Sequence, residues 1–442
     1  MINNKRNYRN FLIIWIGELL AGIGTGMTSF GLGVYVWQLT NSTVDVSMVE
    51  LAALLPLVLL SPIAGVLADR FDRRLLMIIG DTVSALGLVA MLVIMKAGTI
   101  EVWQICLCVG FSSTFSSLLD PAYKATITDL LTKEEYSKAT GMMSLASSAK
   151  FLISPALAGL ALSYFNIELI LIIDILTLVI TVSVIFAVRK SLTVELVKQG
   201  KLHILKDLKE GWLQLNENKG VRKLVILVTL VCFYLGFVQV LSKPMCLPLM
   251  DEKGLGIMQT ICGCGTLLAG IVIGSGKLSR NYVNVMGISF VVGGAAMVGF
   301  GATMIVPVIA AMGFVFFATL PFADTSTNYL IRITIKNEQQ GRVWGLIALI
   351  SQLGYVLAYG ISGILSDYVF IPALRPDGVL AGSVGKIMGT GETRGVSLLI
   401  MISGFGLIMI AFLVFQSKDI RDLEEVDSHI GYLIKPVSQQ EK

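Results

Sequence analysis

The sequence has too little charge to be a water-soluble globular protein. Charged residues make up 14% of the 442 residues and hydrophobic residues 55%, whereas soluble domains contain about 25% charged residues. Such a chain cannot cover a water-facing surface, so the composition indicates a polytopic membrane protein. The net charge of +4 is too small to indicate binding to nucleic acid.

Residues for metal, redox or nucleotide chemistry are also scarce. The two His residues, His203 and His429, lie in polar segments, which excludes an intramembrane His relay. None of the six Cys residues forms a CxxC pair, so neither a zinc site nor a disulfide framework is indicated. A GxxxxGK nucleotide loop is missing, which argues against ATP-driven transport. We therefore expect no enzyme activity, no metal and no cofactor.

The sequence is rich in long apolar runs. Twelve of them are long enough to cross the roughly 30 Å hydrocarbon core as helices. They cover 11–37, 46–67, 75–96, 101–124, 138–164, 167–188, 222–248, 255–275, 283–301, 303–331, 342–365 and 395–416. An even number of spans places both termini on one side of the membrane.

The distribution of Lys and Arg predicts which side that is. If the N-terminus is cytoplasmic, only six of the 34 Lys and Arg residues fall on the opposite side, and Lys150 lies within a span. The six are Lys96, Lys243, Lys253, Arg375, Lys386 and Arg394. By the positive-inside rule, both termini are predicted to be cytoplasmic.

A hydrophilic segment, 189–221, divides the spans six and six. The predicted domains are a six-helix lobe at 1–188, a second at 222–416, and a cytoplasmic tail at 417–442. Within the linker, one helical face is apolar, which predicts an amphipathic helix at the inner membrane surface. That face contains Ile204, Leu205, Leu208, Trp212 and Leu215.

The two halves also repeat. The series Asp120, Lys138, Gly141 and Gly159 recurs, with the same spacing, as Asp324, Arg342, Gly345 and Gly363. Six plus six spans with a parallel repeat and a central inner linker predict an all-α, two-lobed secondary transporter.

The predicted loop between the second and third spans reads "GVLADRFDRRLLM". It resembles the loop signature of the major facilitator superfamily, and the resemblance extends over essentially the whole chain. The D-R-x-D-R form, in which Asp72 replaces a Gly, and the P-D-G-x-L-A-x-S-V-G string within 366–393 are similar to the macrolide-efflux branch. The family's antiporter pattern in 138–164 is incomplete, because Lys150, Ser154 and Ala158 stand where Gly is expected.

The resemblance implies an inner gate at this loop. Its residues would be Gly65, Asp69, Arg70, Arg73 and Arg74, with Asp129 as an acidic partner. An Asp at this surface can cap a neighbouring helix N-terminus and offset its dipole. The alternative is a basic loop that only sets topology, but such a loop needs no Asp.

Placing an ionisable side chain in the middle of the membrane costs about 2.5–3.5 kcal/mol or more, so each such residue requires a structural or functional explanation. We expect proton or ion coupling to involve Glu18, Lys150, Asp120 and Asp324, with Glu18 as the leading proton carrier and Lys150 as its ion-pair partner. The alternatives are a Glu18 that reaches inner water and a self-neutralised i,i+4 pair of Asp120 with Lys124. Pro121, which lies between these two residues, is expected to bend the fourth span. Asp174 is interpreted as a structural residue bonded to a neighbouring helix.

Aromatic and polar residues of the later spans suggest a cavity for a bulky amphipathic solute. The candidates are Phe233, Tyr234, Phe237, Gln239, Asn328, Tyr329, Gln352 and Tyr355. The alternative is that these side chains only pack between helices.

These features predict a bacterial cell-membrane transporter that exports hydrophobic or amphipathic compounds, such as macrolide-like drugs or secreted metabolites, by proton-driven alternating access. We expect it to act as an antiporter, to confer antibiotic resistance and to be monomeric. Two other functions stay open. One is a lipid or lysophospholipid transporter of the same fold without proton coupling, and the other is a non-transporting membrane sensor.

Overall fold

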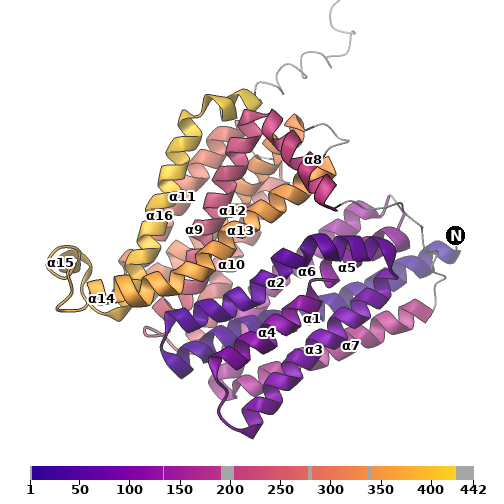
Figure 1. Ribbon diagram of the computed structural model, residues 1–442, viewed down its shortest axis with the longest axis horizontal. Coiled ribbons are helices and arrows are strands. Elements are labelled where there is room, and N and C mark those ends of the chain that lie inside the picture. Colours follow the sequence, from indigo (N-terminus) through magenta and orange to yellow (C-terminus); the bar gives the residue numbers. More distant parts are fainter. Residues whose placement is uncertain (1, 133, 191–203, 277–280, 336–339, 425–442) are drawn as a thin grey trace, which may run out of the picture. The chain divides into compact units, whose positions relative to one another are not determined.

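The computed structural model describes residues 2–132, 134–190, 204–276, 281–335 and 340–424 (Figure 1). In these ranges the chain forms helices and no strand, and twelve helices are long and apolar enough to cross a membrane. The first six spans are α1 (Ile2–Thr40), α2 (Thr43–Arg70), α3 (Arg73–Ala97), α4 (Val102–Ser116) with α5 (Leu119–Leu130), α6 (Tyr136–Tyr164) and α7 (Ile167–Lys190). The other six are α9 (Lys219–Cys246), α10 (Glu252–Gly274), α11 (Tyr282–Ala302), α12 (Val306–Thr334), α13 (Gln340–Leu365) and α16 (Glu392–Gln416).

Each predicted span coincides with a helix, but the fourth is broken. Helix α4 ends at Ser116 and α5 begins at Leu119. Pro121 explains the position of the break, because a proline has no N–H for the carbonyl four residues earlier and its ring crowds that carbonyl. Here that carbonyl belongs to Ser117, which lies between the two helices. The predicted bend is confirmed as a break one turn before the proline.

The chain folds into two compact units that cross the predicted lobe boundaries. Unit 1 contains 1–202, 238–263 and 359–397, and unit 2 contains 203–237, 264–358 and 398–442. Helices α9, α10, α13 and α16 are therefore each divided between the units.

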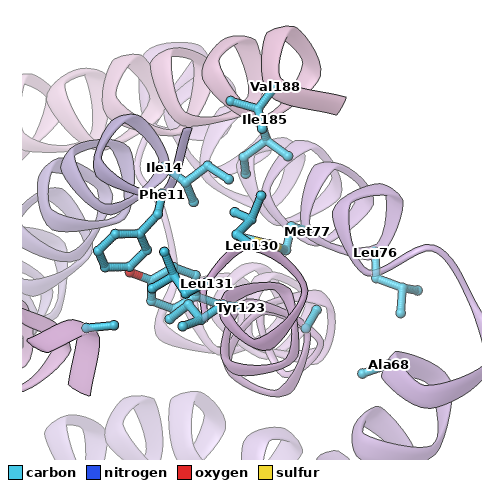
Figure 2. Close-up of a cluster of buried hydrophobic side chains, with 13 residues drawn as sticks. Phe11, Ile14, Ala68, Leu76, Met77, Tyr123, Leu130, Leu131, Ile185 and Val188 are labelled. Carbon is cyan, nitrogen blue, oxygen red and sulfur yellow. The ribbon is translucent and has the colours of Figure 1, made fainter. Parts of the chain in front are cut away.

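Unit 1 is built around α1, which packs against α6 and α7, while α3 packs against α4, α5 and α7. A cluster of buried apolar side chains fills the space between these helices (Figure 2). Phe11 and Ile14 of α1 meet Met77 of α3, Tyr123 of α5 and Ile185 of α7 in this cluster. These side chains form the apolar cluster of unit 1.

Unit 2 is held together by close helix contacts and by its C-terminal segment. Gly294 of α11 and Gly404 of α16 approach so closely that a Cβ on Gly294 would lie 2.6 Å from the Gly404 carbonyl oxygen. The Oε1 atom of Glu424 accepts a hydrogen bond of 2.8 Å from the backbone N–H of Val283, at the first turn of α11. Asp419 forms an ion pair with Lys223 of α9.

The predicted linker helix is present as α8 (Ile204–Glu217). Leu215 is buried and Trp212 is half exposed. The side chains of Ile204, Leu205 and Leu208 lie outside the described residues, as do 191–203 and the tail beyond Glu424.

Candidate functional site

Two glycines of α1 face charged residues of the flanking helices. A Cβ on Gly24 would lie 3.0 Å from Oδ1 of Asp174 in α7, and a Cβ on Gly26 would lie 3.0 Å from Cγ of Lys150 in α6. Glycine lets helix backbones approach closely in a bilayer. Here it also makes room for an acid on one side of α1 and a base on the other.

Glu18 lies two turns before Gly26 on α1. Its Oε1 atom is buried, and no hydrogen-bond donor reaches it in the described part of the chain. The acids that act on it electrostatically are Asp120 of α5 and Asp81 of α3. Glu18 is therefore an intramembrane carboxyl among other carboxyls, without a basic partner in the described structure.

Lys150 interacts with a different acid from the one we expected. Among described residues it forms no ion pair with Glu18, and the carboxylate that acts on it is Asp174. Asp174 is 1% exposed and accepts a hydrogen bond of 3.3 Å from the Thr25 hydroxyl of α1. This contact supports the interpretation of Asp174 as a residue that links α7 to α1.

Asp120 and Asp324, the two acids related by the repeat, each bind the side chain four residues later on the same helix. Lys124 pairs with Asp120 at 2.7 Å, as the i,i+4 spacing predicts, and both side chains are largely exposed. Asn328 donates a hydrogen bond of 2.9 Å to Oδ2 of Asp324. The second acid therefore has an amide partner where the first has an ammonium group.

Two side chains of the predicted inner gate loop, those of Arg73 and Asp72, are bonded to other parts of unit 1. Arg73 donates to the carbonyl oxygen of Ala68, at 3.2 Å, and to that of Ala125 in α5, at 3.0 Å. Asp72 accepts a hydrogen bond of 3.1 Å from the backbone N–H of Arg74 and so caps α3. Its other oxygen pairs with Arg189 of α7 at 2.8 Å.

The remaining gate residues differ from one another. Arg74 is buried and Arg70 is exposed. In the described part of the chain, nothing lies within 4 Å of where a Cβ on Gly65 would be. The side chains of Asp69 and Asp129 lie outside the described residues, so the role expected of these two acids stays a prediction.

Most of the predicted cavity aromatics are engaged in packing. Phe233 makes edge contacts with Tyr234 and Phe237, with ring centroids 5.4 and 5.0 Å away. Tyr329 stacks on Tyr282 at 3.8 Å.

The predicted polar candidates are divided between bonded and exposed side chains. Gln239 accepts a hydrogen bond from the Tyr359 hydroxyl. Tyr355 lies beside the Cys232 thiol. Gln352 is exposed, and Asn328, which is bonded to Asp324, is partly buried.

Unit 1 contains a second set of polar contacts, which the sequence did not single out. Lys243 of α9 forms an ion pair with Glu50 of α2; the Lys243 side chain is buried and that of Glu50 is partly buried. Asp367, just beyond α13, accepts hydrogen bonds from the Ser42 hydroxyl at 3.1 Å and from the backbone N–H of Val44 at 3.0 Å. Asp367 thus caps the first turn of α2. The signal that could have found Glu50 is that it is the sole acid in its predicted span.

A cleft of about 490 Å³ opens in the same unit. Its lining includes Trp37, Gln38, Pro244, Met250, Glu252 and Glu392. Gln38 donates a hydrogen bond to Oε1 of Glu252, which joins α1 to α10.

Comparison with known proteins decides the family. The model of the Major Facilitator Superfamily matches residues 14–372. The chain belongs to this superfamily. As a major facilitator protein it is a multi-pass membrane transporter and not an enzyme.

Relatives of this major facilitator include efflux proteins. Macrolide efflux protein A of Streptococcus pyogenes is 25% identical over 371 residues, which cover 81% of this chain and 90% of the relative. The uncharacterised MFS-type transporter YfiS of Bacillus subtilis is 22% identical and covers 94% of this chain and 95% of its own length. The multidrug efflux pump Tap of Mycolicibacterium fortuitum is 29% identical, but over only 37% of this chain and 41% of its own.

Solved structures agree on the fold. The nucleoside transporter NupG matches with a TM-score of 0.70 at 14% identity, over 92% of this chain and 100% of that chain. A bacterial homologue of the human lysosomal transporter Spinster matches with a TM-score of 0.67 at 13% identity, over 95% of this chain and 97% of that chain. At these identities the likeness establishes the fold alone.

Proposed function

We propose that this transporter is an antiporter that exports hydrophobic or amphipathic compounds, including macrolide-like drugs, in exchange for protons. The observation that supports this most is the similarity to macrolide efflux protein A, which extends over 90% of that relative. The D-R-x-D-R loop, residues 69–73, agrees with the same branch. In this proposal the protein is a monomer in a bacterial cell membrane, with both termini in the cytoplasm.

Proton coupling is assigned to Glu18. An ion at mid-bilayer without a partner costs about 2.5–3.5 kcal/mol or more, so a carboxyl there tends to hold a proton. Glu18 has a buried oxygen without a donor, and its electrostatic neighbours among described residues are acids. Binding and release of a proton at Glu18 would change the charge of the unit 1 interior, which is the kind of local change that shifts an alternating-access equilibrium.

Lys150 and Asp174 are assigned a supporting role in the same scheme. They attract one another electrostatically, and they lie close to Gly26 and Gly24 of α1. Among the described residues neither forms an ion pair with Glu18, which therefore has no fixed counter-charge. Lys150 therefore helps to set the electrostatic environment of Glu18, and Asp120 adds a negative charge from α5.

Drug accumulation in an efflux-deficient bacterium tests the proposal. Cells expressing the wild type, Glu18→Gln or the control Glu101→Gln are loaded with erythromycin, ethidium or an amphipathic peptide. Each measurement is made with and without a protonophore. Glu101 is an exposed acid at the start of α4.

We expect cells with the wild type or the control variant to accumulate less of at least one probe than cells without the transporter. The protonophore and Glu18→Gln should each abolish this difference. Export that persists with the protonophore present would contradict proton coupling and favour the lipid-transport alternative.

A further inference from the structure

A second intramembrane carboxyl, Asp81 of α3, lies near Glu18 and was not singled out by the sequence. Its side chain is 1% exposed, and its Oδ2 atom has no hydrogen-bond donor within the described residues. The Ser84 hydroxyl bonds to the backbone of this residue and not to its carboxyl group, because it donates to the Asp81 carbonyl oxygen at 3.0 Å. A buried polar atom without a partner costs about 1–3 kcal/mol and needs an explanation.

The groups that face Asp81 do not neutralise a charge on it. Glu18 of α1 and Asp174 of α7 act on it electrostatically, and both are acids. Helix α5 presents Asp120 and Tyr123, which act on Glu18. Helix α4, which packs against α3, has no charged residue. Lys150 acts on Asp174 and is not among the groups that act on Asp81.

A metal ion is not the ligand that this arrangement favours. In the described ranges, the acids do not come together as a set of three ligands with the geometry of a metal site. A proton needs only one carboxyl oxygen. It also removes the charge, whose burial without a partner is expensive.

The apolar cluster separates Asp81 from the end of unit 1 that contains the start of α1. Met77 lies one turn before Asp81 on α3, and Ile14 lies one turn before Glu18 on α1. Both side chains are fully buried in the cluster, together with Ile185 (Figure 2). Water cannot pass through such close apolar packing, so proton exchange at Asp81 requires rearrangement of the cluster or access from its other side.

We propose that Asp81 is a proton-binding residue of the transport cycle that works together with Glu18. This inference rests on the proposed function, because it adds a second residue to the proposed coupling. A proton bound at Asp81 leaves as its O–H bond breaks, and either Glu18 or water accepts it. Because two negatively charged carboxylates repel one another, ionisation of either Asp81 or Glu18 disfavours ionisation of the other.

Infrared difference spectroscopy of purified protein in lipid tests proton binding without any substrate. We expect the C=O band of a protonated carboxylic acid at neutral pH in the wild type and in Ser84→Ala, with loss of part of this band in Asp81→Asn. Ser84 is a buried neighbour on the same helix and serves as the matched control. An unchanged band in Asp81→Asn would show that Asp81 holds no proton and would overturn the inference.

Transport in proteoliposomes then tests coupling, with erythromycin and ethidium as probes. We expect Asp81→Asn to lose accumulation driven by a pH gradient while it keeps gradient-independent exchange, and Asp81→Glu to recover gradient-driven accumulation. A folded Asp81→Asn protein that accumulates the probe as the wild type does would overturn the inference. If the wild type accumulates neither probe, the proposed drug efflux fails, and the infrared band alone decides whether Asp81 binds a proton.

Discussion

The ammonium group of Lys243 in α9 occupies the space where a side chain on Gly33 of α1 would lie, and there it pairs with Glu50 of α2. The side chains of Lys243 and Glu50 are 7% and 17% exposed. A single ion pair thus joins three helices within unit 1. Loss of one member would leave the other as an uncompensated buried charge.

We expect Lys243→Met and Glu50→Gln to lower the free energy of unfolding by about 3–5 kcal/mol each, the cost of an unpaired buried charge. The double variant should lose less than either single variant, because it leaves no charge behind. Thermal unfolding in detergent, followed by tryptophan fluorescence, measures this, with the exposed Lys96→Met as a control. A double variant whose loss equals the sum of the single losses would show that the two charges do not interact.

Asp72, which stands where the family pattern has Gly, makes two stabilising contacts in unit 1. It caps α3 and pairs with Arg189. We expect Asp72→Ala to cost about 0.5–2 kcal/mol, the usual value of an N-cap. Asp72→Asn should cost less, because an amide oxygen still accepts the bond from the Arg74 N–H. Equal melting temperatures for the Ala and Asn variants would contradict the capping role.

Gly159 and Gly141 provide a matched pair on α6. A Cβ on Gly159 would collide with the Glu252 carbonyl oxygen and lie 3.2 Å from Cα of Gly256 in α10, whereas no described residue lies within 4 Å of a Cβ on Gly141. Gly159→Ala should therefore destabilise the protein by forcing the two backbones apart. Gly141→Ala should be neutral or stabilising by up to about 1 kcal/mol, because Ala favours the helix. The order of melting temperatures checks this, and the reverse order would show that α6 and α10 do not pack closely.

The pair of Asp419 with Lys223 predicts an acid-dependent loss of stability in unit 2. Hydrogen bonding by Lys223 lowers the pKa of Asp419 below its ordinary value of 3.8. A depressed folded-state pKa contributes stability above the ordinary value, and this is lost as pH falls through the folded-state pKa. Melting temperatures measured from neutral pH down to below pH 3.8 should fall more for the wild type than for Asp419→Asn. Parallel curves would show that the pair adds nothing, as many exposed ion pairs do.

The spans could be predicted from sequence because length and hydropathy alone define a membrane helix. The Asp120–Lys124 pair could be predicted as well, since i,i+4 neighbours meet on any helix. The break in the fourth span was anticipated from Pro121, although its position one residue beyond Ser116 needed the hydrogen-bond register of the helix.

Contacts between distant helices could not be predicted in the same way. Lys150 was expected to pair with Glu18, but the acid that acts on it is Asp174 of α7. Sequence spacing contains no information about which flanking helix supplies the acid. Two of the groups that Arg73 binds are backbone carbonyls, which every residue has. Asp81 is different: it is the sole acid within 75–96, so the rule that selected Glu18 would also have selected it.

Proton flux driven by the transported compound tests the central claim most directly. Proteoliposomes containing the wild type, without an imposed pH gradient, enclose a pH-sensitive dye and receive erythromycin or ethidium on one side. The account predicts that downhill movement of the probe drives protons in the opposite direction, and that Glu18→Gln abolishes this proton flux. Movement of the probe through the wild type without any change in internal pH would contradict proton-coupled efflux.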